Sequence, residues 1–554
     1  MPRLAGKQMV MEMLRAEGVE YIFGNPGTSE GPLLDALEGY PDLKYMLATQ
    51  ESVAMGMAEA YARSTGKPSF VNLHIQTGLA NGISLLHNAS ESGTPMVLTS
   101  CNSDIRKLAE GRTDLTEMTN EFTKWSAEVT HAEQVPGVLR RAFNEAKTPP
   151  TGPTYVAFSA NALDDEADVD IVPSGEGYFR TAPDSRAIEE AGRMLAEASH
   201  PVMLVGERLA HSGGAAEAIR VAELVGARVY APYYSEMNFP TSHPQFLGRA
   251  SGMLPAGRAQ LSSADVVLCV GTTVASGYFY TSGHALGDDT KLIHIDSDPR
   301  EVGKSEPTHL GMIADPKTAL ASLADALEST MSGSDREAAK GRAVAAGEEK
   351  EAQRAAWTNR VKDRWDVSPM STERMMTEIA GALPPDAIIA DDSVTTRGSV
   401  QGALDFNEPG SVFGERGGSL GWGMGGALGL KLANPDRPVV AVVGDGSAMM
   451  AVQALWTAVN AKIPVVYVIC NNSSYRILKL NMNTYKSHVL KDSAPESQHI
   501  AMDFPTPFNF AGIAAAFGLD SCRIEDPAEL APAMKRALEL GEPALLDVAI
   551  DPSV

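Results

Sequence analysis

Cysteine is scarce in this chain of 554 residues, and its four cysteines lie far apart in the sequence. No C-x-x-C pair occurs, which argues against a structural zinc site and against the disulfide framework of a small secreted protein. Cys269 and Cys470 lie inside apolar runs, where a small buried side chain is the expected interpretation. Nothing in the cysteine pattern therefore predicts a metal centre or a secreted protein.

Long apolar runs and dense basic clusters are missing as well. No run of 18 apolar residues exists, so no membrane span is expected, and the N-terminal segment has the pattern of an amphipathic helix, not of a signal peptide. Lys and Arg total 46 against 70 Asp and Glu, a formal net charge of −24. Such a surface repels nucleic acid and anionic membranes. We predict a cytoplasmic protein that binds neither.

The pattern of strands and helices predicts an α/β protein of several domains, because 554 residues exceed what one hydrophobic core can serve. Two polar segments divide the chain. The stretch "DDEADVDIVPSGEG" is typical of a linker, and residues 334–365, rich in Ala, Glu, Lys and Arg, predict a solvated helix. We predict three domains, at residues 1–165, 184–328 and 368–554. The first and third share a strand–helix rhythm, which suggests related sheets.

Short runs rich in β-branched residues mark the strands that the sequence predicts. In the three blocks, in order, they are "YIFG", "YMLAT", "PSFVNLH", "PMVLTS" and "TYVAFS"; "PVMLVG", "ARVYAP", "DVVLCVG" and "KLIHIDSD"; "AIIADD", "VVAVVG", "VVYVIC" and "ALLDVAI". Helical patterns separate most of them, which predicts parallel sheets covered by helices.

The stretch "VVAVVGDGSAMMAVQALWTAVNAKIPVVYVICNNSSY" carries the chemistry. It predicts two buried parallel strands joined by a helix that spans "SAMMAVQALWTAVNA", so Asp445 and Asn472 should emerge at neighbouring strand ends. A carboxylate, an amide oxygen and a backbone carbonyl are ligands that Mg²⁺ prefers beside phosphate oxygens. Gly444 and Gly446 would let the backbone turn and approach a phosphate. The plainer alternative is that "GDG" and "NN" only shape turns, and no G-x-x-x-x-G-K-[ST] loop offers a different phosphate site.

"GDG", 24 further residues and then "NN" resembles the diphosphate-binding motif of thiamine diphosphate (ThDP) enzymes. The segments "YIFGNPGTSEGPLLDAL", "MLATQESVAMGMAEAYARSTGKPSFVNLH" and "GSLGWGMGGALG" are similar to the benzoylformate decarboxylase branch of the decarboxylase/acetolactate synthase superfamily. The resemblance extends over nearly the whole chain. It implies pyrimidine-binding, central and diphosphate-binding domains, each a doubly wound parallel-sheet sandwich. It also implies a homo-oligomer, a dimer or a homotetramer, with each active site between two subunits.

The resemblance also implies which residues hold the cofactor. Asp445, Asn472 and the backbone carbonyl of Ser474 would bind Mg²⁺. The groups expected around the diphosphate and the rest of the cofactor are Thr395, Gly446, Ser447, Tyr475 and Ile477, the last also lining the substrate pocket with Asn481. Leu420 would wedge the cofactor into a bent conformation, and the Gly418 carbonyl would accept a hydrogen bond from it. Core packing is the alternative for Leu420, and a helix N-cap the alternative for Thr395.

The catalytic residues that the resemblance implies lie mainly in the first domain. Glu51 would bond the pyrimidine ring and activate the cofactor, although an isolated Glu here would more often complement a helix dipole. His74 would face the substrate as an acid, a base or a carboxylate-binding group, and Thr28 would contact the substrate carboxylate. This chain departs from the family where a second histidine is expected, since Tyr278 takes that place and His284 follows six residues later.

The sequence therefore predicts an enzyme, a ThDP- and Mg²⁺-dependent lyase that decarboxylates a 2-oxo acid. Carboligation with an aldehyde could accompany this reaction. An acetolactate synthase-like or aldehyde-lyase-type carboligase is the alternative, favoured by the missing second histidine. Arg476 and Lys479 add positive charge near the pocket, although Arg476 could equally be a surface residue. A non-catalytic ThDP-binding protein is the third interpretation, and the presence of both Glu51 and Asp445 opposes it.

Overall fold

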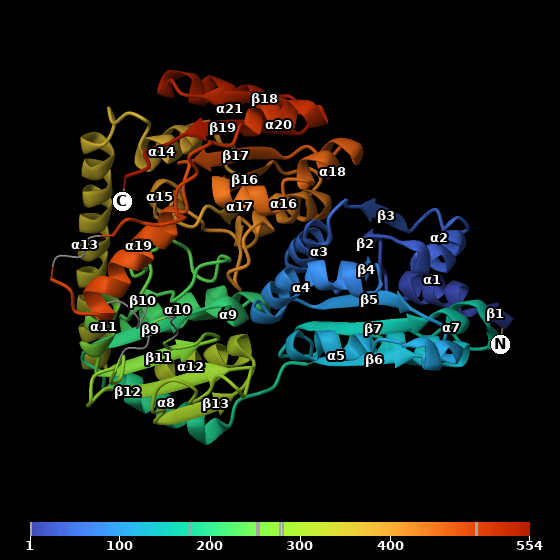
Figure 1. The fold of residues 1–554 in the computed structure, drawn as a ribbon. Helices are drawn as coiled ribbons and strands as arrows, with labels where there is room; N and C mark the ends of the chain where they lie inside the picture. The colour runs from blue at the N-terminus through green and yellow to red at the C-terminus, as the bar shows by residue number, and fades with distance from the viewer. Residues whose placement is uncertain are drawn as a thin grey trace.

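The computed structural model describes residues 3–177, 179–250, 255–275, 279, 282–493 and 497–553. Figure 1 shows three lobes: the N-terminal one in blue to cyan, the central one in green to yellow, and the C-terminal one in orange to red. Each contains one parallel β-sheet with helices packed against it. The predicted α/β class with three sheet domains is confirmed. No helix within the described ranges is long and apolar enough to cross a membrane.

The N-terminal sheet has six parallel strands in the order β3-β2-β4-β5-β7-β6. They are β2 (Tyr21–Asn25), β3 (Lys44–Leu47), β4 (Ser69–Leu73), β5 (Met96–Asn102), β6 (Trp125–Val129) and β7 (Pro153–Ser159). The helices of this part are α1 (Gly6–Ala16), α2 (Gly31–Leu37), α3 (Glu51–Thr65), α4 (Ile75–Glu91), α5 (Leu115–Thr119), α6 (Val135–Lys147) and α7 (Ala160–Asp164). A separate antiparallel pair joins β1 (Arg3–Ala5) to β8 (Glu166–Asp168), so part of the predicted linker is a strand.

The C-terminal sheet repeats this topology in the order β15-β14-β16-β17-β19-β18. Its strands are β14 (Ile388–Asp392), β15 (Val412–Gly414), β16 (Val439–Gly444), β17 (Val466–Asn471), β18 (Asp520–Ile524) and β19 (Ala544–Ala549). Counted along the chain, both sheets run 2-1-3-4-6-5, so they share one topology. The helices are α14 (Thr372–Ala382), α15 (Arg397–Ala403), α16 (Trp422–Ala433), α17 (Asp445–Met450), α18 (Ala454–Asn460), α19 (Arg476–Thr484), α20 (Phe510–Phe517) and α21 (Leu530–Glu539).

The central sheet has five parallel strands in the order β10-β9-β11-β12-β13. They are β9 (Pro201–Val205), β10 (Arg228–Tyr230), β11 (Val266–Val270), β12 (Lys291–Asp296) and β13 (Leu310–Ile313), with helices α8 (Ser185–Ala196), α9 (Glu207–Ser212), α10 (Ala215–Val225), α11 (Pro255–Ser262) and α12 (Pro316–Thr330). The polar segment predicted as a solvated helix is α13 (Gly333–Asp363), in which only Ala339 and Ala346 are buried. Figure 1 shows α13 running beside both the central and the C-terminal lobe.

One predicted helix is in fact two. The segment after β16 forms α17 and α18, separated at residues 451–453. Gly421, which has a φ of +94°, brings its loop against this break, where an added Cβ would lie 3.1 Å from the Cβ atoms of Met450 and Ala451. Because the helix breaks here, Met450 does not lie on the buried face that the helical spacing predicts. Its side chain is 50% exposed.

Helices α3 and α16 pack closely because small residues line their contact. A Cβ at Gly425 would lie 2.6 Å from the Val53 carbonyl oxygen, and one at Gly429 would lie 2.0 Å from the Met57 oxygen. Any larger residue at these two positions would separate the helices. The N-terminal and C-terminal domains of one chain are therefore joined along this helix pair.

A buried guanidinium adds the central domain to this junction. Arg63 on α3 donates from Nε to Glu236 Oε1 (2.5 Å), from Nη2 to the Ser235 carbonyl (3.0 Å) and from Nη1 to the Gly414 carbonyl (2.8 Å). Its side chain is 1% exposed, and Glu59 lies 3.5 Å away. Burial opposes its charge, but Glu236 and Glu59 hold the pKa of Arg63 above its ordinary value. One side chain thus bonds to all three domains.

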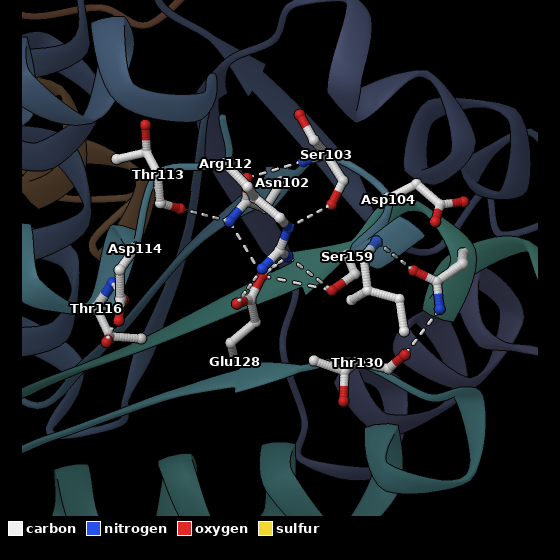
Figure 2. Close-up of polar contacts among 12 residues, drawn as sticks. Asn102, Ser103, Asp104, Arg112, Thr113, Asp114, Thr116, Glu128, Thr130 and Ser159 are labelled. Atoms are coloured by element: carbon white, nitrogen blue, oxygen red, sulfur yellow. Dashed lines mark hydrogen bonds and ion pairs between the residues drawn. The ribbon is translucent and has the colours of Figure 1, made fainter. Parts of the chain in front are cut away.

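A second ion pair fixes the loop that follows β5. Figure 2 shows the Arg112 guanidinium facing Glu128 on β6 and Ser159 at the end of β7. Arg112 Nε also donates to the Ser103 carbonyl (2.8 Å), and Asn102 donates to Glu128 (3.0 Å) and to the Thr113 carbonyl (3.0 Å). Residues 103–114 are therefore tied to the carboxyl ends of three neighbouring strands.

We expect Arg112→Met to release this loop, because Glu128, 17% exposed, would lose its cationic partner. Removing one member of a buried pair costs about 3 kcal/mol. Hydrogen–deuterium exchange of peptides spanning residues 103–114 should become about 10-fold faster or more, with a lowered thermal midpoint. Arg106→Met is the matched control, since Arg106 lies in the same loop with an 80% exposed side chain. Equal exchange in the two variants would contradict the anchoring role.

Candidate active site

A cavity opens at the carboxyl ends of β16 and β17, which pair in parallel with Gly444 opposite Cys470. Asp445 and Asn472 follow directly from these two strands, and both line the cavity, as the sequence predicts. The remaining lining residues come from the same domain: Ser393, Val394, Thr395, Thr396, Leu420, Gly444, Gly446, Ser447, Cys470, Ser474, Tyr475, Arg476 and Ile477. Adjacent parallel strands thus deliver their side chains to one place.

The Asp445 carboxylate has one occupied and one free oxygen. Oδ1 accepts from the Gly446 N–H at 2.7 Å, whereas Oδ2 is buried without a partner. Burial raises the pKa of Asp445 to about 6, although neighbouring backbone N–H groups act in the opposite direction. An unpartnered buried carboxylate oxygen is a costly arrangement unless a cation or ligand completes it. The residues present therefore fit a hard cation such as Mg²⁺.

The two asparagines after β17 have different surroundings. Asn471 Nδ2 donates to Asp547 Oδ1 (2.9 Å) and to the Phe508 carbonyl (3.2 Å), so this side chain belongs to the core of the sheet. Asn472 Oδ1 lies at the cavity and accepts from the N–H of Ser474 at 3.0 Å and from its hydroxyl at 3.1 Å. Successive side chains at the end of an extended strand point to opposite sides, so the two consecutive asparagines have different surroundings. Only the second asparagine can face a ligand.

The glycines of "GDG" stand where the chain passes directly from β16 into α17, and neither has a positive φ. What Gly446 provides is space: an added Cβ would lie 2.5 Å from the Tyr475 ring. That ring also meets Phe504 edge-on at 4.7 Å. The missing side chain of Gly446 therefore places Tyr475 in the cavity wall.

Ser447 is held by a carboxylate that the sequence did not single out. Its hydroxyl donates to Asp392 Oδ2 (2.5 Å) and accepts from the Gly421 N–H (2.8 Å). Burial raises the pKa of Asp392 to about 7, and the Gly421 and Gly423 N–H groups donate to the same Oδ2. Asp392 thus fixes the loop that carries Leu420 into the cavity. Its only sequence signal was its position at the end of a predicted strand.

Most of the other residues predicted to contact the cofactor line the cavity, and one does not. Thr395, Leu420, Tyr475 and Ile477 line the cavity, whereas Gly418 does not. Gly418 has a φ of +81° and donates its N–H to Glu415 Oε2 at 2.7 Å.

Arg476 lines the cavity too. Its Nε is buried and has no hydrogen-bond partner among the residues that the structure describes. The alternative that Arg476 is a plain surface residue is wrong. Lys479, by contrast, forms an ion pair with Asp503.

Glu51 starts helix α3 at the carboxyl edge of the N-terminal sheet. It is 7% exposed, and its two oxygens accept from Asn25 Nδ2 and Asn81 Nδ2, each at 3.0 Å. Gly78 leaves room for it, since an added Cβ there would lie 3.0 Å from Oε1. Two amides therefore orient this carboxylate without neutralising it.

His74, at the end of β4, is held by a buried acid. Its Nδ1 lies 2.8 Å from Glu30 Oε2 and 2.9 Å from the Ser29 hydroxyl, and its ring covers Gly27. Glu30 is fully buried and also accepts from the N–H groups of Gly27 and Cys101. A carboxylate at Nδ1 favours the tautomer that leaves Nε2 free to exchange a proton. Sequence reasoning missed Glu30 and Ser29, whose only signal was their place in the loop after β2.

Two further predicted residues lie elsewhere, and a third is not described. Thr28 is exposed, and its side chain makes no hydrogen bond within the described part of the chain. His284 is 59% exposed and pairs with Glu306 (3.2 Å), and it does not line the cavity. Tyr278 lies outside the described residues. Its neighbour Phe279 stacks on Tyr485 with ring centroids 6.1 Å apart, beside the end of α19.

The chain therefore carries two separate sets of candidate site residues. Oxygen donors and the Arg476 guanidinium line the C-terminal cavity, while Glu51 and His74 lie at the corresponding edge of the N-terminal sheet and do not line it. No group of three His, Cys, Asp or Glu side chains able to hold a metal occurs among the residues that the structure describes. A metal ion in this cavity would thus be bound by the Asp445 carboxylate together with amide, backbone and ligand oxygens.

Three family models match the chain in order. Residues 4–124 match the thiamine pyrophosphate enzyme N-terminal TPP binding domain, residues 188–323 the central domain, and residues 395–548 the C-terminal TPP binding domain. Glu51 and His74 fall within the match to the N-terminal TPP binding domain, and Asp445 and Asn472 fall within the match to the C-terminal one. These matches agree with the sheets and with the cavity described above.

Full-length relatives have the same organisation. Benzoylformate decarboxylase of Pseudomonas aeruginosa is 29% identical over 97% of both chains, and the acetolactate synthase large subunit of Haemophilus influenzae is 27% identical over 100% of this chain and 96% of its own. The solved thiamine diphosphate-dependent 4-hydroxybenzoylformate decarboxylase of Rhodococcus jostii superposes with a TM-score of 0.85 at 27% identity, covering 99% of this chain and 100% of its own. The chain belongs to the thiamine pyrophosphate enzyme family and is a ThDP-dependent enzyme.

Proposed function

We propose that the protein decarboxylates a 2-oxo acid to an aldehyde, using ThDP and Mg²⁺. The observation that carries this proposal is the His74–Glu30 pair at the carboxyl edge of the N-terminal sheet. Loss of carbon dioxide leaves a carbon that must be protonated, and a histidine held at Nδ1 by a buried carboxylate is suited to deliver that proton from Nε2. Relatives named as decarboxylases of benzoylformate and 4-hydroxybenzoylformate support the same class of reaction.

The C-terminal cavity would hold the cofactor's diphosphate and its metal ion. Asp445 Oδ2, the Asn472 side chain and the Ser474 backbone carbonyl would bind Mg²⁺. Thr395 and Tyr475 would contact the diphosphate, and Arg476 would add a positive charge. Leu420 would pack against the bound cofactor. When bound, ThDP supplies the electron sink for cleavage of the carbon–carbon bond.

The N-terminal residues would come from a second subunit. Glu51 is oriented by two amides but does not line the cavity of its own chain. A homodimer, or a tetramer built from such dimers, would place Glu51 and His74 of one chain opposite Asp445 of the other. Glu51 would then hold or move a proton on the cofactor's ring nitrogen, and His74 would face the substrate.

Carboligation is the second candidate reaction. His284 is exposed and paired with Glu306, so it offers no obvious second proton donor beside His74. Slow protonation would give an aldehyde acceptor time to compete, as in enzymes that join two carbonyl compounds. The acetolactate synthase relatives favour this alternative.

Incubation with aromatic, aliphatic and acidic 2-oxo acids, alone and with added aldehydes, separates the two reactions. We expect at least one 2-oxo acid to give carbon dioxide and an equal amount of aldehyde. The products are identified by NMR. Turnover should require both ThDP and Mg²⁺. Release of carbon dioxide only together with a coupled acyloin would assign the carboligase reaction instead.

Mixing two inactive variants tests the shared site. Glu51→Gln and Asp445→Asn should each reduce turnover by about 100-fold or more. After the two variants are unfolded and refolded together, half of the randomly assembled dimers contain one chain of each kind. One of the two sites in such a dimer is intact, so activity should return to about a quarter of wild type. Glu38→Gln, on the exposed surface of the same domain, is the control for substitution. Sites built within one chain would give no recovery, and a non-catalytic protein would show no turnover to lose.

Glu30→Gln tests the proton-delivery role. The amide keeps the shape of the side chain but cannot hold His74 in the same tautomer, so aldehyde release should slow by about 10- to 100-fold. The fraction of acyloin formed with an added aldehyde should rise, and the pH profile of kcat should change. Ser29→Ala, which removes only one hydrogen bond to His74, should have a smaller effect on all three. An unchanged product ratio would argue against His74 as the proton donor.

A further inference from the structure

A second cavity, of about 400 Å³, lies between the central domain, helix α13 and helix α15, apart from the site described above. Tyr234, Phe246 and Arg249 contribute from the central domain. Lys350, Gln353, Arg354, Trp357 and Arg360 contribute from α13, and Gly398, Gln401 and Gly402 from α15. The α13 residues are spaced three or four apart, so they present one helix face to the cavity. The volume is typical of a small-molecule site.

The charge of this cavity is opposite to that of the protein. Four cationic side chains (Arg249, Lys350, Arg354 and Arg360) line it, against the single carboxylate of Asp405. The whole chain carries a formal charge of −24. In so acidic a protein, a cavity with an excess of three positive charges concentrates anions locally.

The cations in the cavity are poorly neutralised by the protein itself. The side chains of Arg249 and Arg360 form no hydrogen bond or ion pair with any residue in the described ranges. Arg354 reaches Asp405 only at 3.4 Å. Burial and the charge of Arg354 lower the pKa of Lys350, and burial and Arg397 lower the pKa of Arg249. Repulsion between the cavity cations Lys350 and Arg354 is relieved when an anion binds between them.

Aromatic rings form the other part of the lining. Lys350 Nζ lies 5.6 Å from the centre of the Phe246 ring, and the Trp357 indole lies flat against Gly402, where an added Cβ would be 2.7 Å away. Rings beside cationic groups recognise a ligand that has a flat apolar body next to its charge. We propose that this cavity binds a small organic anion, a carboxylate or a phosphate ester carried on an aromatic or apolar group.

The position of α15 gives such a ligand a route to the active site. The second cavity is lined by Gly398, Gln401 and Gly402 of this helix. The cavity of the candidate active site is lined by Thr395 and Thr396, which lie just before the helix. Arg397, the first residue of α15, bonds Asp391 at the end of β14 (2.9 Å). A ligand that orders α15 should therefore change the affinity for ThDP, and ThDP should change the affinity for the ligand by the same factor.

Titration of the full-length protein with four probes tests the proposal: phenyl phosphate, phenylacetate, inorganic phosphate and benzyl alcohol. We expect phenyl phosphate or phenylacetate to bind saturably by calorimetry, at least about 10-fold more tightly than inorganic phosphate or benzyl alcohol. Which of the two binds more tightly assigns a phosphate ester or a carboxylate. Trp357 fluorescence should change on binding, and Trp357→Phe should remove that signal.

Variants on α13 locate the bound probe. Arg354→Gln together with Arg360→Gln should raise the Kd of the preferred probe about 10-fold or more. Lys340→Gln is the matched control, because Lys340 is an exposed cation of the same helix outside the cavity. An unchanged Kd in the double variant, no saturable binding of either organic anion, or a variant that alters only the oligomeric state would overturn the proposal. Turnover is not measured, so failure here leaves the proposed decarboxylase function untouched.

Discussion

The buried Arg63 guanidinium is the interaction on which the domain arrangement depends. It leaves α3 of the N-terminal domain, bonds the Ser235 carbonyl and Glu236 of the central domain, and reaches the Gly414 carbonyl of the C-terminal domain. A charge this deeply buried is tolerated only when its donors are matched, so losing any partner would penalise the whole junction. Arg63, which does not line the cavity of the candidate active site, therefore holds the three domains together beside the α3–α16 contact.

Duplicated topology explains how two sheets can share one task. Both run 2-1-3-4-6-5, so each strand of one sheet has a counterpart in the other. The residues that follow corresponding strands differ between the two sheets. His74 follows the third strand of the N-terminal sheet, and Asp445 follows the third strand of the C-terminal sheet. In the proposed reaction, one sheet would offer groups that exchange protons, and the other would offer groups that bind the diphosphate and its metal ion. Such a site would need both sets, which is the physical argument for the proposed second subunit.

The central strands of each sheet could be predicted from the sequence, and the edge strands largely could not. The unpredicted strands β6, β13, β15 and β18 all lie at sheet edges. Strand β18 reads "DSCRI" and is only partly buried, because an edge strand has one neighbour and more solvent. A continuous apolar run marks a strand buried on both faces, and that signal is absent here. Whether these segments form strands depends on their pairing and packing within the sheet, which only the folded structure defines.

For the candidate site, the sequence by itself determined that Asp445 and Asn472 end neighbouring parallel strands, because a βαβ unit leaves few other arrangements. It also placed His74 at a strand end and Glu51 at the start of a helix that follows a strand. Only the tertiary structure decided that Glu30 holds His74, that Asp392 holds Ser447, and that Asn471 belongs to the core. These partners are far apart along the chain, and no local pattern records which side chains meet when separate strands are brought together.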